Sequence, residues 1–445
     1  MVSIDLGPGL VAALPTARGC FCDRGPAPSL SLFRGSPVVD MSVEEGRIFE
    51  ESRAGDPVAL ARALVTTPSV NPGLEESGVG EAAVAELTAE WLRAWGLSVE
   101  MSEVAPGRWN VVGRLEGEGE GEGEGEGVGP ILLLNGHLDT VGTVGMSIDP
   151  FGAELREGRI WGRGACDMKG GVAALLAATA KLARVNLPGT LIVALTADEE
   201  YASLGMEALV RAGLKADAAI VCEPTSLAVM PAHKGFVWVE AHFAGRAAHG
   251  SRPDVGVDAI EHAGRYLVKL DELKDRLGTR EPHPLLGQGS FHAGTIEGGS
   301  APSVYPDSCR LVLERRTLPG ENAADIIEEF QAVLDVLAGE VPELEAKLTQ
   351  GLARPATEVR SEAPLVKGLL AACTAEGVDA VLEGMTAWVD AAFLNQAGTP
   401  AVCFGPGSIA QAHSANEWID PSEIVTCAAV IERFAHRFFR ETQAR

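Results

Sequence analysis

The chain has 445 residues, of which 46% are hydrophobic and 22% are charged, so it is long enough to form more than one globular domain. Its 62 acidic residues outnumber 36 basic ones and give a formal net charge of −26, which repels nucleic-acid phosphates and anionic lipid. Nucleic-acid and membrane partners are therefore not expected, and no apolar run in the sequence reaches membrane-spanning length.

The eight cysteines form neither a disulfide framework nor a zinc-thiolate pattern. Only Cys20 and Cys22 are close neighbours, and no C-x-x-C pair occurs in the sequence. The N-terminus lacks a basic segment followed by an apolar core, so no signal peptide is expected. A reducing, cytoplasmic setting is therefore predicted.

The first predicted elements follow a segment without periodicity. Residues 1–43 are rich in Gly and Pro and predict a disordered extension, with a start site assigned too early, ahead of Met41, as the alternative interpretation. A helix is expected to begin after Asp56 as its N-cap, and a second helix is expected over Glu81–Trp95. Two strands then follow, at Leu97–Val104 and Trp109–Leu115.

An alternating Glu/Gly tract, Glu116–Gly127, predicts a flexible surface loop, because it buries no apolar surface and its charges repel one another. Beyond it, apolar strands alternate with helices. The strands are expected at 131–135, 190–196 and 218–222, and the helices at Lys169–Leu182 and Met206–Ala212. Continuous apolar strands separated by helices indicate a mostly parallel sheet that is covered on both faces.

From Gly235 the pattern becomes that of helices packed on an antiparallel sheet. Strands are expected at 236–243, Ser290–Glu297 and Ser308–Arg316, and helices at Asp258–Leu273 and Ala323–Leu337. After Gly351 the α/β pattern returns, with helices at Leu365–Ala375 and Ile424–Arg440 and a strand at 401–404. The predicted architecture is an α/β catalytic domain, split into 44–234 and 350–445, with an inserted α+β domain over 235–349.

Histidine and acidic residues follow the predicted strands, which is where open α/β sheets build their sites. His137 and Asp139 come directly after strand 131–135 and point to the same side of an extended segment. The imidazole can then bind a metal while the carboxylate orients its ring. A lone histidine at a strand end is more often structural, and the neighbouring aspartate is what favours a metal ligand.

Further candidate metal ligands occur at other loops and strand ends. Asp167 lies in G-R-G-A-C-D-M-K-G-G, between a strand and a helix, where it is either a metal-bridging ligand or a helix N-cap. Glu199 and Glu200 end one strand and Glu223 ends another, with solvated loop carboxylates as the alternative interpretation. His413 follows the strand at 401–404. A lone loop histidine is usually not a metal ligand, so His413 is considered one only because the other candidates are present. Together they match a two-metal site with one carboxylate left as general base.

Four motifs, in this order along the chain, resemble a known family: G-H-L-D-T-V, G-R-G-A-C-D-M-K-G-G, T-A-D-E-E and A-H-S-A-N-E. The chain is similar, from Asp56 to its C-terminus, to the acetylornithine deacetylase / succinyl-diaminopimelate desuccinylase family of dinuclear zinc amidohydrolases. The resemblance implies a zinc-exopeptidase-like catalytic domain, an inserted lid and dimerisation domain, and a homodimer. It also implies two Zn²⁺ per subunit, with Co²⁺ as a substitute.

The resemblance assigns roles to the metal ligands. It implies that His137 binds one zinc and His413 the other, while Asp167 bridges both. Glu200 and Glu223 would complete the two coordination shells.

Catalytic roles are implied in the same way. Glu199 would be the general base, Asp139 the partner of the His137 ring, and Asp167–Met168 a cis peptide bond. His249 would reach the partner subunit's site and stabilise the oxyanion, although on its own it would be read as an exposed loop residue.

Two residues would contact the substrate. Arg316 would bind the substrate carboxylate, with a surface pair to Glu314 as the alternative. Ser303 stands where many relatives carry Asn.

The implied activity is hydrolysis of the amide bond of an N-acyl amino acid, with N-acetylornithine, cleaved to ornithine and acetate, as first candidate. E-P-T-S-L and G-P-G-S-I-A-Q-A-H are most similar to the acetylornithine deacetylase branch, whereas T-A-W-V-D (386–390) departs from it. N-succinyl-diaminopimelate, other N-acyl amino acids and dipeptides are the alternatives. A non-catalytic binding relative is disfavoured because every ligand position is filled. A thiol nucleophile is disfavoured because Cys166 and Cys222 adjoin carboxylates.

Overall fold

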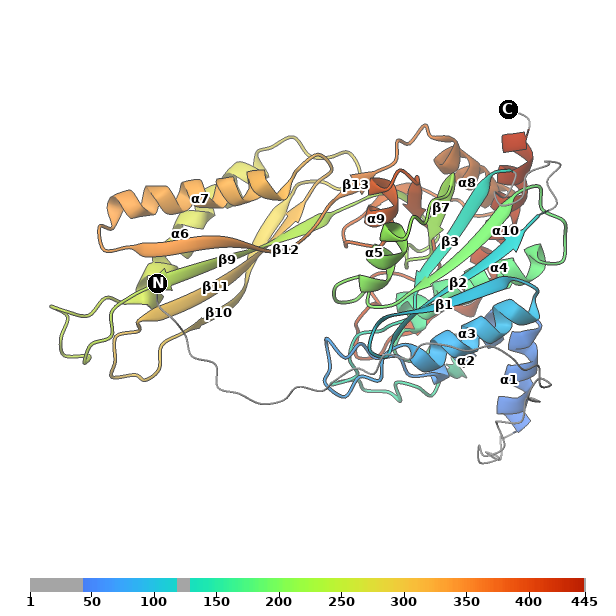
Figure 1. Cartoon of the computed structure of the whole chain (residues 1–445), viewed down its shortest axis with the longest axis horizontal. Helices are drawn as coiled ribbons and strands as arrows, with labels where there is room; N and C mark the ends of the chain where they lie inside the picture. The colour runs from blue at the N-terminus through green and yellow to red at the C-terminus, as the bar shows by residue number, and fades with distance from the viewer. Residues whose placement is uncertain (1–42, 118–128, 444–445) are drawn as a thin grey trace, which may run out of the picture. The chain divides into compact units, whose positions relative to one another are not determined.

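The computed structural model describes residues 43–117 and 129–443 (Figure 1). The expected N-terminal extension, apart from Val43, lies outside the described residues, as do Cys20, Cys22 and most of the Glu/Gly tract. The first described element is helix α1 (Val43–Arg53).

Within the described residues, the largest sheet has nine strands in the order β1-β2-β6-β3-β7-β15-β8-β13, with β14 beside β8. The strands are β1 (Ser98–Ala105), β2 (Arg108–Glu116), β3 (Ile131–His137), β6 (Thr190–Thr196), β7 (Ala218–Val221), β8 (Val229–His233), β13 (Thr357–Glu358), β14 (Leu382–Met385) and β15 (Ala401–Cys403). The central strands β6, β3, β7 and β15 run parallel, and β1 and β2 are antiparallel at one side. The prediction of a mostly parallel central sheet is confirmed.

Alternate residues of the central strands pack into different cores. In β3, Leu132 and Leu134 belong to one hydrophobic cluster, whereas Leu133 belongs to another. Because successive side chains of a strand point to opposite faces, the two clusters mark the two faces of the sheet. The predicted coverage of both faces is therefore confirmed.

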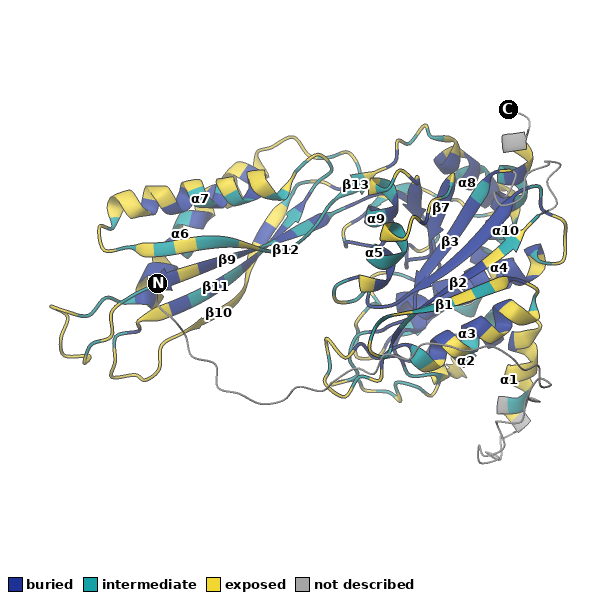
Figure 2. Ribbon diagram, viewed as in Figure 1, coloured by how far each residue is buried: buried dark blue, intermediate teal, exposed yellow. Residues whose placement is uncertain are grey.

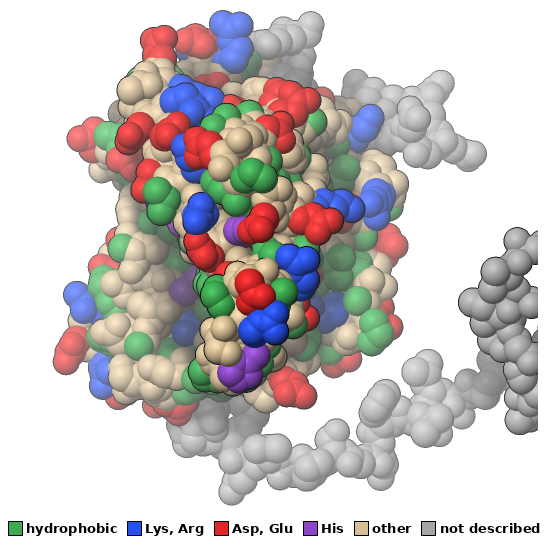
Figure 3. Space-filling model, turned by 90° about the vertical axis from the view of Figure 1, so that its left-hand side faces the viewer, with side chains coloured by type: hydrophobic (Ala, Val, Ile, Leu, Met, Phe, Trp, Pro, Cys, Tyr) green, Lys and Arg blue, Asp and Glu red, His purple; other side chains and the backbone are tan. Residues whose placement is uncertain are grey.

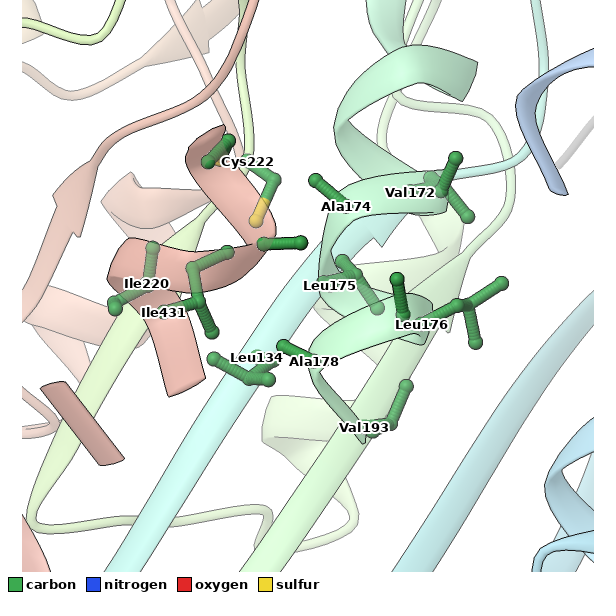
Figure 4. Packing of buried hydrophobic residues seen from close by; sticks show 14 of the residues in the cluster. Leu134, Val172, Ala174, Leu175, Leu176, Ala178, Val193, Ile220, Cys222 and Ile431 are labelled. Carbon is green, nitrogen blue, oxygen red and sulfur yellow. The ribbon is translucent and has the colours of Figure 1, made fainter. Parts of the chain in front are cut away.

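Helices on the first face bury apolar side chains in the larger cluster (Figure 1). They are α2 (Pro57–Thr66), α3 (Ala82–Ala94), α4 (Gly170–Leu182), α8 (Pro364–Ala375) and α10 (Pro421–Gln443). Figure 4 shows Leu134 and Ile220 facing Leu175, Ala178 and Ile431 in this cluster. The second face is covered by α5 (Leu204–Arg211) and α9 (Ala391–Gln396).

Asp56 is the N-cap of α2, as its position before the apolar periodicity predicts. Its Oδ1 accepts the N–H groups of Val58 and Ala59 at 3.0 and 2.8 Å. Pro57 follows at the first helical position, where its missing N–H breaks no helical bond. The local sequence thus determines where this helix begins.

A second, four-stranded antiparallel sheet has the order β10-β11-β9-β12. Its strands are β9 (Gly235–Ala244), β10 (Ser290–Gly298), β11 (Ser308–Thr317) and β12 (Glu345–Arg354), packed with α6 (Ala259–Gly278) and α7 (Ala323–Glu340). The three strands and two helices expected here are present, while β12 was not predicted. The sheet has its own core, including Phe243, Tyr266 and Phe330, and β10 is largely exposed (Figure 2). The domain limits at 235 and 349 stay a prediction.

A small three-stranded sheet, β16-β5-β4, completes the described strands. Its strands are β4 (Glu154–Arg156), β5 (Arg159–Trp161) and β16 (Trp418–Ile419). On the face of the molecule shown in Figure 3, acidic and basic side chains are interspersed. Across the described residues, no helix is both long and apolar enough to cross a membrane.

Candidate dinuclear metal site

The predicted site lies at the carboxyl ends of three adjacent parallel strands. His137 is the last residue of β3, Glu199 and Glu200 follow β6, and Glu223 follows β7. Because β3 pairs in parallel with both β6 and β7, the three strand ends lie at the same edge of the sheet. The side chains predicted from strand ends are therefore brought together.

Asp167 approaches this edge from a short irregular turn, η1 (Ala165–Lys169), that precedes α4. The Asp167–Met168 peptide bond is cis, as the family resemblance implies. Gly164 begins the turn at φ +77°, and a Cβ there would come within 2.6 Å of Thr140. Glycine is therefore needed at position 164 for the backbone to take this path.

The two carboxylate oxygens of Asp167 face different histidines. Oδ1 lies 3.2 Å from His137 Nε2, and Oδ2 lies 3.4 Å from His413 Nε2. His413 Nε2 also lies 3.0 Å from Glu200 Oε2. An aspartate that faces two imidazoles in this way has the arrangement of a bridging ligand.

Two sets of three ligand atoms are close enough to hold an ion. The atoms of His137, Glu199 and Glu223 lie within 4.8 Å of one another, and so do those of His137, Asp167 and Glu200. These carboxylates and imidazoles are the ligand types that zinc accepts.

The electrostatics of the site reflect carboxylates crowded into a space with little water. Burial raises the pKa of Glu199 well above its ordinary value, and the charge of Glu223 raises it further. Burial and the charge of Asp167 raise the pKa of Glu200 to about 7. Hydrogen bonds to Asp167 and Glu200 raise the pKa of His413 to about 10. Burial is the main cause of the raised pKa of both glutamates, and the neighbouring negative charges add a contribution that a bound cation would offset.

The side chains at the site fit divalent cations. Glu200 Oε1 and Glu223 Oε1 are both buried without a hydrogen-bond partner. An unpartnered buried carboxylate oxygen is destabilising, and a metal ligand bond would satisfy it. The residues present therefore suit two cations that share Asp167.

The Asp139 carboxylate supports the turn after β6. It accepts the backbone N–H groups of Glu199 and Glu200 at 3.0 and 3.2 Å, and the Asn71 side-chain amide at 2.7 Å. His137 Nδ1 lies 2.9 Å from the main-chain oxygen of Asp139 and 3.6 Å from its carboxylate Oδ1. Asp139 therefore holds the His137 ring through its backbone, while its carboxylate holds the two glutamates.

A buried ion-pair network lies behind Asp139, and the sequence reading missed it. Arg108 Nη2 bonds to Glu81 at 2.5 Å and Nη1 bonds to Asp198 at 2.9 Å. Asn71 also donates to Asp198, at 3.0 Å. Of these residues only Asp198 stands in one of the four motifs, T-A-D-E-E, and elsewhere only S-V-N-P-G around Asn71, a turn-forming sequence, gave a local signal.

A cavity of about 240 Å³ opens from the acidic cluster. Its other walls include Phe236, Trp238 and Trp388, with the Phe236 ring 5.7 Å from Trp238 and 6.2 Å from Trp388. Arg316 and Arg354 also line it. The cavity thus combines an acidic end with an aromatic wall, which the sequence did not predict.

The three other predicted residues lie in different places. Arg316 lines the cavity, although its Nε also bonds to Glu314 at 2.8 Å, as the alternative interpretation has it. His249 is exposed, and its Nδ1 lies 2.8 Å from Ser251 Oγ. Ser303 is exposed too, and its main-chain oxygen accepts the Gly250 N–H. Neither His249 nor Ser303 lines the cavity within this chain.

The cysteines near the site have the properties of buried structural residues. Burial raises the pKa of Cys222 far above its ordinary value, and Glu223 adds to the effect. Cys166 is affected in the same direction by burial and Asp167. The prediction that these thiols are poor nucleophiles agrees with both directions.

Comparison with protein-family models places the chain in a known family. Residues 133–437 match the model of Peptidase family M20/M25/M40. The chain belongs to this family, and it is a metal-dependent hydrolase.

Curated relatives extend the match over most of the chain. The acetylornithine deacetylase of Myxococcus xanthus is 33% identical over 313 residues, which cover 69% of this chain and 80% of the relative. The acetylornithine deacetylase of Vibrio campbellii is 32% identical over 387 residues, covering 83% of this chain and 96% of the relative.

Solved structures show the same fold. A tripeptidase from Staphylococcus aureus superposes with a TM-score of 0.70 at 22% identity, covering 87% of this chain and 99% of that one. An M20 family metallo-carboxypeptidase from Sulfolobus solfataricus also has a TM-score of 0.70, at 16% identity, covering 86% and 99%.

Proposed function

We propose that the chain hydrolyses the amide bond of an N-acyl amino acid with the help of two divalent cations, zinc in the first instance. The observation that carries this proposal is Asp167, whose two oxygens face His137 and His413. His137 and Glu223 would hold one cation, and His413 and Glu200 the other, with Asp167 shared between them.

Glu199 is the carboxylate left over in this assignment. The bound cations would polarise the scissile carbonyl and lower the pKa of the attacking water. Glu199 would take the proton of that water and return it to the leaving nitrogen, which is the work of a general base and then of a general acid. Its position within 4.8 Å of the His137 and Glu223 ligand atoms suits this role.

The substrate would lie in the cavity with its amide at the acidic end. Arg316, which lines the cavity, is proposed to bind the substrate carboxylate and would exchange its bond to Glu314 for one to the ligand. His249 is proposed to stabilise the oxyanion in the site of a second copy of the chain, because it does not line the cavity of its own. Ser303 is proposed to make a polar contact to the substrate bound in that second copy's site. A homodimer working in the cytoplasm is part of this proposal: the dimer rests on the family resemblance, and the cytoplasmic setting rests on the cysteine pattern and the N-terminal sequence.

N-acetylornithine is the first candidate substrate, because the curated relatives at 32–33% identity carry the name acetylornithine deacetylase. Its cleavage to ornithine and acetate would serve arginine biosynthesis. N-succinyl-diaminopimelate remains an alternative within the family.

A second candidate is favoured by the cavity wall. The cavity presents the aromatic side chains of Phe236, Trp238 and Trp388. Glu314 also lines the cavity, but its carboxylate already accepts hydrogen bonds from Trp238 Nε1, at 3.1 Å, and from Arg316. Aromatic surface stabilises apolar groups. An N-acyl amino acid or dipeptide with an apolar side chain is therefore the alternative to ornithine.

A substrate panel with metal analysis on the same sample tests the proposal. Purified protein with zinc or cobalt would be assayed on N-acetylornithine, N-succinyl-diaminopimelate, N-acetyl-leucine, N-acetyl-phenylalanine and dipeptides. Two metals per chain and a higher kcat/KM for N-acetylornithine than for the others are expected. A preference for N-acetyl-phenylalanine would support the second candidate, and inactivity on every N-acyl amino acid with both metals bound would contradict the proposed reaction.

A further inference from the structure

A buried ion pair joins the turn that carries Asp167 to the segment that carries His413. Arg163 Nη1 and Glu417 Oε2 are 2.7 Å apart, and both side chains are almost fully buried. Neither residue lines the cavity, and within the described residues neither forms a hydrogen bond or ion pair with the side chain of a predicted metal ligand. Their contacts are to backbone groups around the site.

Glu417 uses both carboxylate oxygens to hold the turn before α4. Oε1 accepts the N–H groups of Cys166 and Asp167 at 2.9 and 3.0 Å, and Oε2 accepts that of Gly164 at 3.1 Å. Three backbone N–H bonds to one carboxylate fix the backbone from which the Asp167 side chain projects.

Arg163 ties the same turn to the segment of His413. Its Nη1 donates to the main-chain oxygen of Ser414, next to His413, at 3.3 Å, and its Nε donates to the Gly142 oxygen at 2.9 Å. His413 has φ +61°, a region that residues other than glycine rarely adopt without support from their surroundings. The ion pair therefore bears on the backbone at both Asp167 and His413.

We propose that Arg163 and Glu417 are positioning residues that set the distance between Asp167 and His413, and through it the affinity for the cation that those two share with Glu200. This inference rests on the proposed two-cation function. The other cation would depend less on the pair, because His137 ends a central strand and Glu223 follows one. The pair thus affects the His413 metal position more than the other, although Asp167 is shared by both.

Glu417→Gln tests this with little change in shape. The amide nitrogen cannot accept the N–H groups that one carboxylate oxygen now accepts, and the charge opposite Arg163 is lost. We expect the cation held by Asp167, His413 and Glu200 to bind about 10- to 100-fold more weakly, as for other groups that orient metal ligands. The affinity for the second cation should stay within about threefold of wild type. Raising the free metal concentration should restore kcat.

The readout is metal affinity, measured by titrating metal-free protein with Zn²⁺ against a competing chelator. Titration with Co²⁺ adds an absorption spectrum that reports the ligand geometry of each equivalent. Glu423→Gln is the matched control, because Glu423 accepts the backbone N–H of Gly407 at 2.7 Å but makes no bond to the turn of Asp167. Both of its affinities should remain as in wild type.

Arg163→Lys is a second variant in case Glu417→Gln does not fold. Lysine keeps the charge opposite Glu417 but cannot reach Ser414 and Gly142 together, so the same cation should be weakened to a smaller extent. Equal weakening of both cations, or a lower melting temperature with both affinities unchanged, would overturn the inference. A wild-type protein that binds fewer than two cations would instead contradict the proposed function itself.

Discussion

The Asp139 carboxylate bonds to two backbone groups of the site, and its Oδ1 also lies 3.6 Å from Nδ1 of the His137 ring. It accepts the N–H groups of Glu199 and Glu200, and thereby fixes the turn from which both side chains reach the cluster. The Asn71 side-chain amide donates a third hydrogen bond to the same carboxylate. A charged acceptor with three donors around it is hard to replace, because an amide of the same shape offers one acceptor fewer.

Asp139→Asn is therefore expected to lower kcat/KM by about 10- to 100-fold and the free energy of unfolding by about 1–3 kcal/mol. The new amide nitrogen would point at an N–H donor and leave it unsatisfied. Steady-state kinetics and urea unfolding of the metal-loaded protein measure both effects. Wild-type kinetics in a folded Asp139→Asn variant would show that the carboxylate does not position the glutamates.

Glu199→Gln separates proton transfer from metal binding. Glutamine cannot take a proton from water, so kcat is expected to fall at least about 10²- to 10⁴-fold, while the metal content stays near wild type. Glu200→Gln is the informative comparison, because its predicted role as a ligand implies loss of metal together with activity. Metal analysis and kcat on both variants decide the point, and loss of metal from Glu199→Gln would make that residue a ligand.

At the scale of elements, the strands of the central sheet were predictable because a continuous apolar run of strand length is stable only when it is buried in a core. The strands expected at 131–135 and 190–196 correspond to β3 and β6. The strand β12 was missed, because E-A-K-L-T-Q-G-L-A-R is largely polar and only partly buried. Strand β8 was missed too, since V-M-P-A-H contains a proline and is fully buried without a repeating pattern.

The candidate site was predictable to the extent that it is built from strand ends. His137, Glu199 and Glu223 are placed by the sheet itself, which makes their convergence a consequence of parallel pairing. Glu417 stands in a recognised motif, yet nothing in A-H-S-A-N-E tells which backbone groups its carboxylate will accept. The aromatic wall depends on segments 150 residues apart in the chain, Trp238 and Trp388, which no local pattern connects.

Strand β8 carries a histidine that makes stability depend on pH. Burial lowers the pKa of His233 to about 4. Its ring bonds to the Lys234 oxygen and to Thr357 Oγ1 on β13, which suits a neutral imidazole. In the unfolded chain the pKa is about 6.5, so between pH 6.5 and 4 the unfolded state binds the proton and the folded state does not.

The contribution of His233 to stability is therefore full above pH 6.5 and is lost as the pH falls towards 4, by about 3 kcal/mol in all. His233→Gln lacks this titration. The difference in unfolding free energy between wild type and variant, measured in urea at several pH values, should shift in favour of the variant as the pH falls below 6.5. A difference that is constant between pH 7.5 and 4.5 would contradict a neutral, buried His233.

At the scale of the whole molecule, the excess of acidic residues has two different locations. Much of it is spread over the surface, where the face in Figure 3 shows acidic and basic groups interspersed. A smaller part, Asp167, Glu199, Glu200 and Glu223, is concentrated at one buried edge of the central sheet, where like charges repel in a medium of low dielectric. Only the repulsion within this buried cluster can be relieved by specifically bound cations. These cations stabilise the folded state, because the unfolded chain has no equivalent site.

Metal removal should consequently destabilise the whole fold and not only the site. A cation present at about 100 times its Kd stabilises the folded state by about 2.7 kcal/mol, and a second cation adds a similar amount. Treatment with a chelator is therefore expected to lower both the melting temperature and the urea midpoint, and added Zn²⁺ should restore them. Glu200→Gln should respond less to Zn²⁺, because one cation loses a ligand, whereas Glu76→Gln at an exposed position should respond as wild type does. A melting temperature that is independent of metal would mean that the buried carboxylates are not neutralised by cations, and the two-cation proposal would have to be abandoned.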